Sequence, residues 1–149
     1  MRFASRAVLT RLGAHAALAA LLIAVGEAAA PSAQAGNMLY VICNPAVHVT
    51  QEDLRDVFLG EKQFAGAVRL TPADNRAAQA AFLERILKMA FSKYSTAWTK
   101  KSFRDGVNPP PVKGSDAEAI EYVRREAGAC SYVTTAPPAG VQIVMNSAT

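Results

Sequence analysis

The sequence contains few of the residues from which most active sites and metal centres are built. Its 149 residues include two cysteines, two histidines and one tryptophan. Cys43, Cys130 and His48 do not have the spacing of a zinc site, so we expect no metal and no cofactor. His48 has no nucleophile or carboxylate at motif spacing, and Ser131 does not lie in a G-x-S-x-G turn. The common signatures of hydrolases are missing, and we do not expect an enzyme.

Long hydrophobic runs are also missing. A membrane-spanning helix needs about 20 apolar residues, and the run from Ala16 to Val25 has about half that number. This run follows three arginines and precedes Ala33-Gln34-Ala35, the small-x-small pattern that signal peptidase recognises. Cleavage after Ala30 is disfavoured because Pro31 would follow the cut. We therefore expect residues 1–35 to be a signal peptide, and residues 36–149 to form a periplasmic domain without membrane insertion.

Positive charge is present but not clustered. The formal net charge is +4, and half of it belongs to the leader, which contains Arg2, Arg6, Arg11 and Glu27. The other lysines and arginines are scattered along the chain, whereas a nucleic-acid surface gathers them on one face. We expect no nucleic-acid partner.

The two cysteines, Cys43 and Cys130, both lie beyond the leader. An exported chain with two cysteines usually pairs them, because the periplasm is kept oxidising. The alternative is that they are two small buried apolar residues on separate strands. We favour the disulfide between them, and the alternative stays open at this point.

The rest of the chain alternates between strand-like and helix-like segments. Thr50 with Asp53, and Ser115 with Glu118, form capping boxes at two helix starts. Asp74 or Asn75 would cap a third helix that runs to about residue 90. Strands are expected over 38–43, 67–71, 129–133 and 141–145, and helices over 50–60, 74–90, 92–106 and 115–128. This alternation predicts an α/β fold with at least partly parallel strands.

The order of these segments resembles that of one protein family. An apolar strand ending in Asn44-Pro45 is followed by Leu54-Arg-Asp-Val-Phe-Leu-Gly60, a helix with Phe82, a helix with Trp98, three prolines and Gly128-Ala-Cys-Ser-Tyr-Val133. The pattern is similar to one lobe of the periplasmic substrate-binding proteins of phosphate ABC transporters, which have the type 2 periplasmic binding protein fold. The resemblance implies a single three-layer α/β lobe over residues 36–149, with a mixed, mostly parallel sheet. It also implies an exported, solute-binding-like domain with inorganic phosphate or a similar oxyanion as ligand.

The resemblance also indicates where an oxyanion would bind. Family members that bind phosphate carry a Ser-Gly-Thr turn before the helix with the phenylalanine, and alignment on Phe82 puts Arg76-Ala77-Ala78 there. The nearest candidate ligands are Thr71, Asp74, Asn75 and Arg76. Arg76 would clamp the anion, Asn75 would donate a hydrogen bond, and Asp74 would accept the proton of monohydrogen phosphate. The alternative interpretation is that Asp74 is a helix cap and Arg76 is solvated.

The expected size of the domain leaves the function open. The resembled proteins close two lobes around the ligand and bury most of it. A single lobe binds weakly at an open rim, pairs with a second copy or a periplasmic partner, or binds no solute. The alternative function is therefore a periplasmic protein-interaction module that kept the fold and lost the ligand. Tyr94 and Trp98, four residues apart on one helix, are expected to be core residues.

Overall fold

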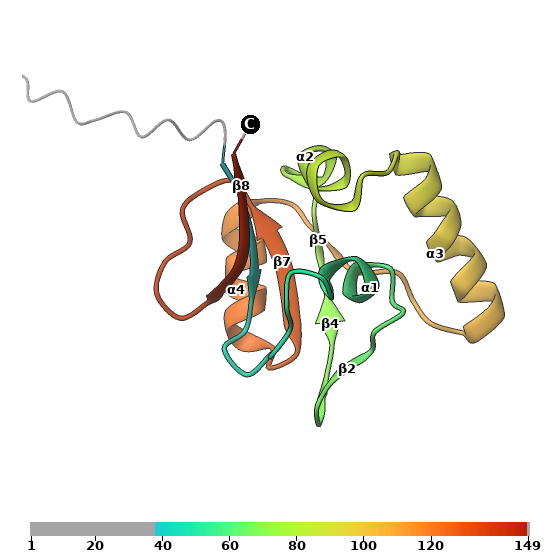
Figure 1. Cartoon of the computed structure of the whole chain (residues 1–149), viewed down its shortest axis with the longest axis horizontal. Helices are drawn as coiled ribbons and strands as arrows, with labels where there is room; N and C mark the ends of the chain where they lie inside the picture. Colours follow the sequence, from blue (N-terminus) through green and yellow to red (C-terminus); the bar gives the residue numbers. More distant parts are fainter. Residues whose placement is uncertain (1–37, 149) are drawn as a thin grey trace, which may run out of the picture. The chain divides into compact units, whose positions relative to one another are not determined.

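The structure is a computed structural model that describes residues 38–148 (Figure 1). The predicted signal peptide, residues 1–35, lies outside the described residues. Among the described residues, none of the helices has the length and apolar character needed to cross a membrane.

A four-stranded sheet has the strand order β4-β7-β1-β8. The strands are β4 (Thr71–Pro72), β7 (Ala129–Val133), β1 (Met38–Cys43) and β8 (Gln142–Ala148). β4 runs parallel to β7, whereas β1 runs antiparallel to both β7 and β8. The expected α/β class with a mixed sheet is confirmed. β4, β7 and β8 run in the same direction, and β1 lies between β7 and β8 and runs against them.

Two smaller strand pairs extend from this sheet. β2 (Phe64–Ala65) and β3 (Val68–Arg69) form an antiparallel hairpin. β5 (Asp74–Asn75) pairs in parallel with β6 (Val112–Lys113). The strand predicted over 67–71 is thus divided between β3 and β4, and Pro72 is the last residue of β4.

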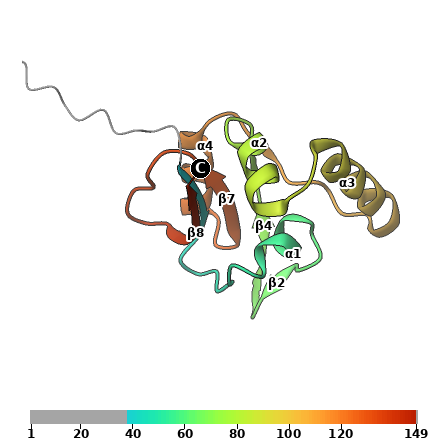
Figure 2. The same cartoon turned by 45° about the horizontal axis from the view of Figure 1, so that its top comes forward.

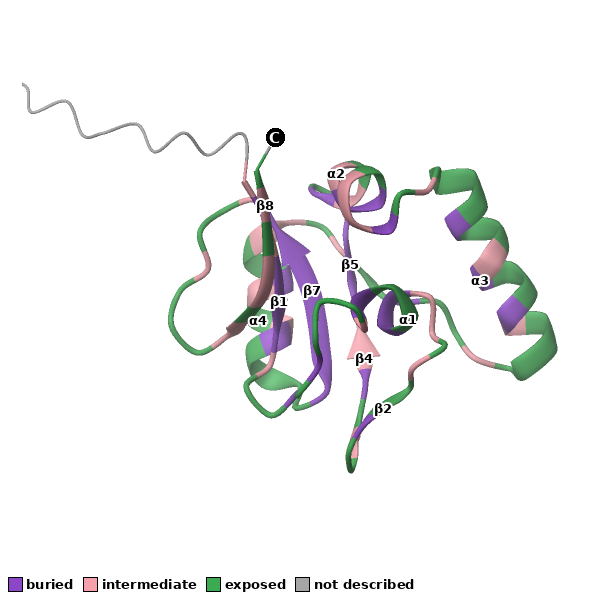
Figure 3. Cartoon of the chain, viewed as in Figure 1, coloured by how far each residue is buried: buried purple, intermediate pink, exposed green. Residues whose placement is uncertain are grey.

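Helices cover both faces of the sheet, as expected for three layers (Figures 1 and 2). Side chains of β1 alternate between the faces because successive strand residues point to opposite sides. Leu39, Val41 and Cys43 belong to the larger core, with α1 (Leu54–Phe58) and α2 (Gln79–Phe82). Ile42 belongs to a smaller core with residues of α4 (Asp116–Arg125). Figure 3 shows β7 buried along its whole length between these layers.

The helices agree only in part with their predicted bounds. α1 begins at Leu54, because Thr50 donates its N–H to the Asp53 carboxylate at 2.9 Å and residues 51–53 form a turn. α3 (Phe91–Asp105) ends at the predicted glycine, Gly106. Ser115 caps α4 by accepting from the N–H of Glu118 at 3.3 Å. β8 reaches three residues beyond the predicted strand, to Ala148.

The helix predicted over 74–90 is wrong at both ends. Asp74 and Asn75 belong to β5, so neither is the predicted helix cap. The helix begins at Gln79, continues as a π-helical turn, η1 (Leu83–Leu87), and ends at Lys88 with a φ of 52°. The predicted caps are wrong because both side chains are buried in the interior, where they form hydrogen bonds with residues that are distant in the sequence.

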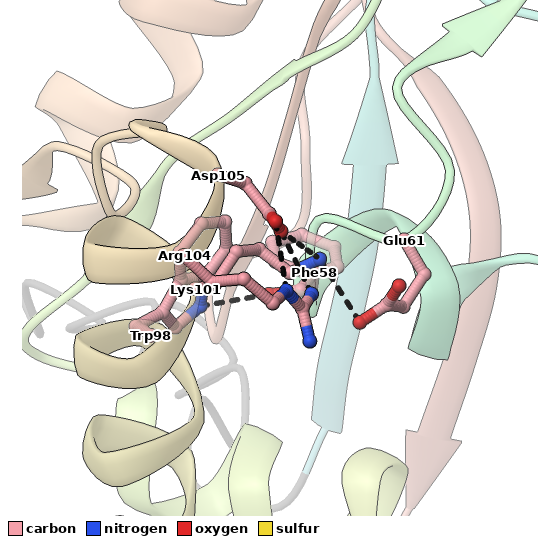
Figure 4. Close-up of polar contacts among 6 residues, drawn as sticks. All are labelled: Phe58, Glu61, Trp98, Lys101, Arg104 and Asp105. Carbon is pink, nitrogen blue, oxygen red and sulfur yellow. Dashed lines mark hydrogen bonds and ion pairs between the residues drawn. The ribbon is translucent and has the colours of Figure 1, made fainter.

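α3 is attached to the end of α1 by a small polar cluster (Figure 4). The indole N–H of Trp98 donates to the carbonyl of Phe58 at 3.1 Å. Lys101, only 6 % exposed, pairs with Glu61 at 3.0 Å and with Asp105 at 3.7 Å. Tyr94 and Trp98 are both buried, which confirms the prediction that they are core residues.

The predicted disulfide joins Cys43 of β1 to Cys130 of β7. The two residues are direct cross-strand partners, and their Cα atoms lie 4.0 Å apart. The alternative of two unpaired buried thiols is excluded for this structure.

Candidate functional site

The four residues proposed from the sequence do not form one group. Thr71 is in β4, Asp74 and Asn75 are in β5, and Arg76 follows β5. Thr71 lines one cavity, whereas Asp74 and Arg76 line another. Residues that are close in the sequence are separated here because this extended segment directs its side chains to different sides.

Asp74 is the centre of a buried polar cluster. It is 4 % exposed, and its carboxylate accepts hydrogen bonds from the hydroxyls of Tyr94 at 3.0 Å and Tyr132 at 2.9 Å. Burial raises the pKa of Asp74, while hydrogen bonds from Tyr132, Tyr94 and Gln79 partly oppose this shift. Burial and the neighbouring carboxylate likewise raise the pKa of both tyrosines, so both remain hydroxyl donors.

Asn75 is fully buried and does not line either cavity. Its side chain stabilises the fold through hydrogen bonds. Its side-chain amide donates to Asp116 at 2.6 Å and to the carbonyl of Tyr132 at 2.9 Å, and its oxygen accepts from the N–H of Ala77. Asp116 also accepts three bonds of 2.9 Å from Thr134 and Thr135. Burial alone would raise the pKa of Asp116, but these hydrogen bonds outweigh it and the pKa is lowered. Both donors of Asn75 are therefore already used.

Thr71 lines a cavity of about 490 Å³ beneath the connector 106–111, which we call the proline-connector cavity. Its carbonyl accepts from the hydroxyl of Tyr122 at 3.3 Å. Its own hydroxyl is enclosed and has no hydrogen-bond partner among the described residues. Because that oxygen is shielded from solvent, it is not available to a ligand in this conformation.

The second cavity, of about 520 Å³, lies along α3, and we call it the Asp74 cavity. Asp74 contributes a buried carboxylate to it, and Arg76 is an exposed cation at its wall. The side chain of Arg76 makes no ion pair or hydrogen bond with any residue of the described range 38–148. The remaining lining residues are Gln79, Phe91, Tyr94, Ser95, Trp98, Thr99, Ser102, Phe103, Pro109, Pro110 and Val112.

The Asp74 cavity therefore combines an uncompensated cation with hydroxyls and a carboxylate. Ser95, Thr99 and Ser102 recur at helical spacing and form one hydroxyl stripe of α3. These groups suit an anion that still carries a proton. The proton forms a hydrogen bond to the carboxylate of Asp74, and Arg76 supplies the positive charge that attracts the anion. Among residues 38–148, no group of three or more histidine, cysteine or acidic side chains is placed to hold a metal ion.

The sequence interpretation missed most of this lining. Gln79 and the hydroxyl stripe lie 3 to 26 residues beyond Arg76 in the chain, on elements that were predicted only as helices. The helical spacing of Ser95, Thr99 and Ser102 was the one feature of the sequence from which the hydroxyl stripe could have been predicted. Nothing in the sequence indicated that Tyr132 reaches Asp74, because that contact spans 58 residues.

No family model matches the chain, and no curated protein sequence matches it. Solved structures that are similar to parts of it include two phosphate-transport proteins. Against PstS from Borrelia burgdorferi the TM-score is 0.48 with 14% sequence identity, covering 65% of this chain and 40% of that one. Against an ABC-type phosphate transport receptor from Vibrio cholerae the TM-score is 0.44 with 13% identity, covering 73% of this chain and 46% of that one. The chain thus spans less than half the length of either protein.

Proposed function

We propose that this is an exported, solute-binding-like domain that holds a small protonated oxyanion, such as monohydrogen phosphate, in the Asp74 cavity. The observation that carries the proposal is the placement of Arg76, a cation without a partner among the described residues, at the same cavity as the buried carboxylate of Asp74. Phosphate is chosen as the test ligand because the sequence resemblance implies it.

The carboxylate sets the selectivity that we expect. An ionised Asp74 repels a fully ionised anion, but it accepts a hydrogen bond from an anion that still carries a proton. Monohydrogen phosphate meets this requirement at neutral pH, whereas sulfate does not. Phosphate should therefore bind more tightly than sulfate.

The affinity should be low. The cavity is open along α3, so Arg76 remains solvated and its attraction for an anion is screened by salt. We expect a dissociation constant of about 1 mM, which corresponds to about 4 kcal/mol of standard binding free energy.

Titration calorimetry at low ionic strength tests the proposal. Arg76→Ala should abolish phosphate binding, because it removes the charge that attracts the anion. The matched control is Arg69→Ala, which removes another exposed arginine, one that lines the proline-connector cavity. No binding to the wild-type protein at 20 mM phosphate, or an equal loss in both variants, would contradict the proposal.

Export is the second part of the proposal. The leader pattern described above supports cleavage after Ala35, so that the mature protein begins at Gly36. The intact mass of protein recovered from the periplasm should match residues 36–149. A mass that includes the leader would contradict this part and leave the binding site untouched.

A protein-interaction module is the second candidate function, and the edge strand β8 favours it. β8 forms one edge of the four-stranded sheet, contains neither a charged residue nor a proline, and exposes Ile143 at 47 %. Uncharged edge strands readily pair with another chain. Light scattering on the mature protein and on an Ile143→Lys variant tests this candidate, since a dimer that dissociates in the variant would support it.

A further inference from the structure

Exposed apolar side chains gather at the Asp74 cavity. Five large hydrophobic residues are exposed within residues 38–148, and three of them, Phe91, Phe103 and Val112, line this cavity. Phe103 is 89 % exposed and Phe91 is 60 % exposed. Single exposed apolar residues are normal on a protein surface, but several around one cavity mark a binding surface. Inorganic phosphate has no apolar part that would use them.

The cavity is also longer than an inorganic oxyanion. Phe91 begins α3 and Phe103 lies near its end, so they are about 18 Å apart along the helix axis. Asp74 is held by Tyr94, near the Phe91 end. The connector from Gly106 passes Pro109 and Pro110 before Val112 pairs with Asp74. A polar end near Asp74 thus continues into an apolar path beside Pro109, Pro110 and Phe103.

We propose that the ligand is an elongated phosphate monoester in its singly protonated form, with its phosphate at Arg76 and Asp74 and an apolar tail along α3 towards Phe103. This inference rests on the proposed function, because it keeps the same anion site and adds the substituent that the anion carries. When the tail covers the exposed rings of Phe103 and Phe91, apolar surface of both the rings and the tail is removed from water. The affinity should therefore rise with the length of the tail.

A series of alkyl phosphates tests the proposal. The probes are inorganic phosphate and methyl, butyl and octyl phosphate, each below its critical micelle concentration and at about pH 5.5, where a phosphate monoester mostly keeps one proton. The fluorescence of Trp98, the only tryptophan of the chain and part of the cavity wall, reports binding. Full burial of one methylene favours binding about fourfold. For a tail in an open groove we expect about a twofold gain per methylene.

Three variants test which residues bind the phosphate of the ligand and which contact its tail. Phe103→Ala should remove most of the gain from the tail without weakening methyl phosphate. Phe64→Ala is the matched control, because Phe64 is another exposed phenylalanine, at 55 %, and does not line the cavity. Arg76→Ala should weaken every member of the series by a similar factor. All three positions are exposed, so the variants should fold.

The outcomes separate this inference from the proposed function. If phosphate binds through Arg76 but the affinity does not change with tail length, the tail proposal fails and the oxyanion site stands. Equal effects of Phe103→Ala and Phe64→Ala would also overturn the tail proposal. If octyl phosphate binds as well to the Arg76→Ala variant, or no probe binds, both proposals fail. A dimer that Phe103→Ala dissociates would show that a second copy covers this face, and would overturn the tail proposal.

A free ester and a membrane lipid can present the same phosphate and tail. Sedimentation with phosphatidylcholine vesicles that contain phosphatidic acid distinguishes the two sources. Binding of octyl phosphate without co-sedimentation assigns the site to a soluble ester. Co-sedimentation that is lost in both Arg76→Ala and Phe103→Ala assigns the same head and tail contacts to a lipid.

Discussion

The indole N–H of Trp98 donates a 3.1 Å hydrogen bond to the main-chain carbonyl of Phe58, and so attaches α3 to the end of α1 (Figure 4). Phe58 is the last residue of α1, and the chain turns at Gly60, which has a φ of +70°. A Cβ atom on Gly60 would lie 2.6 Å from Cη2 of Trp98. The position of α3, and with it one wall of the Asp74 cavity, therefore depends on glycine at this turn.

Gly60→Ala should destabilise the domain by about 2–4 kcal/mol. The left-handed backbone costs about 1 kcal/mol for a residue with a side chain, and displacement of the indole adds about 1–3 kcal/mol. Gly106→Ala is the matched control, because Gly106 has a φ of +67° but a Cβ atom there would meet no other atom within 4 Å. Urea unfolding measures both variants, and equal losses of stability would show that the contact with Trp98 is unimportant.

Asp74→Asn should change how stability depends on pH. Burial raises the pKa of Asp74 in the folded protein above the unfolded value of about 3.9. Its contribution to stability is therefore fully present below about pH 3.9 and is lost as the pH rises through the folded pKa. The free energy of unfolding of the wild type minus that of Asp74→Asn should fall as the pH increases above about 4. Parallel curves for the two proteins would refute this prediction.

Asp116→Asn should show the opposite dependence. Hydrogen bonds from Thr135, Asn75 and Thr134 lower the pKa of Asp116 despite its partial burial, so its contribution is present above the unfolded value and is lost as the pH falls through the folded pKa. At pH 7 the loss should be about 1–2 kcal/mol, since bonds to a charged acceptor are weakened. Urea unfolding at pH 7 and at pH 3 checks this. The variant should approach the wild type at the lower pH, and a constant difference would count against the prediction.

Replacing both Cys43 and Cys130 with alanine should destabilise the domain strongly. The disulfide joins residues separated by 87 positions, and in the entropic description closing such a loop contributes about 4.6 kcal/mol. Denaturant unfolding of the double variant, beside the reduced wild type, measures the loss. A stability within about 1 kcal/mol of the oxidised protein would show that the unfolded chain is already compact.

The elements with strong local signals were predictable from the sequence. The apolar run of β1, the stop at Gly106 and the capping pair of Ser115 and Glu118 each depend on neighbours within a few positions. The cysteines were paired correctly because the choice involved only two residues. The position of β1 between β7 and β8 could not be predicted, because these strands are far apart in the sequence.

The candidate site was harder to predict, because its geometry depends on distant contacts. Asp74 and Asn75 have the residue types of helix caps, but Tyr132 and Asp116 draw them into the interior from 58 and 41 positions away. Arg76 was the one candidate whose expected exposure and charge agree with the cavity that it lines. Adjacent positions in the chain did not imply a common cavity for Thr71 and Arg76.

The disulfide has a further consequence for the connectivity of the chain. It closes residues 43–130 into a covalent ring, and every residue that lines the Asp74 cavity lies within that ring. A protease that cuts once inside the ring, for example at the exposed hairpin tip around Gly66, leaves both pieces linked through sulfur. The nicked molecule keeps its mass apart from one added water, so the two walls of the cavity stay tethered even when the peptide chain between them is broken.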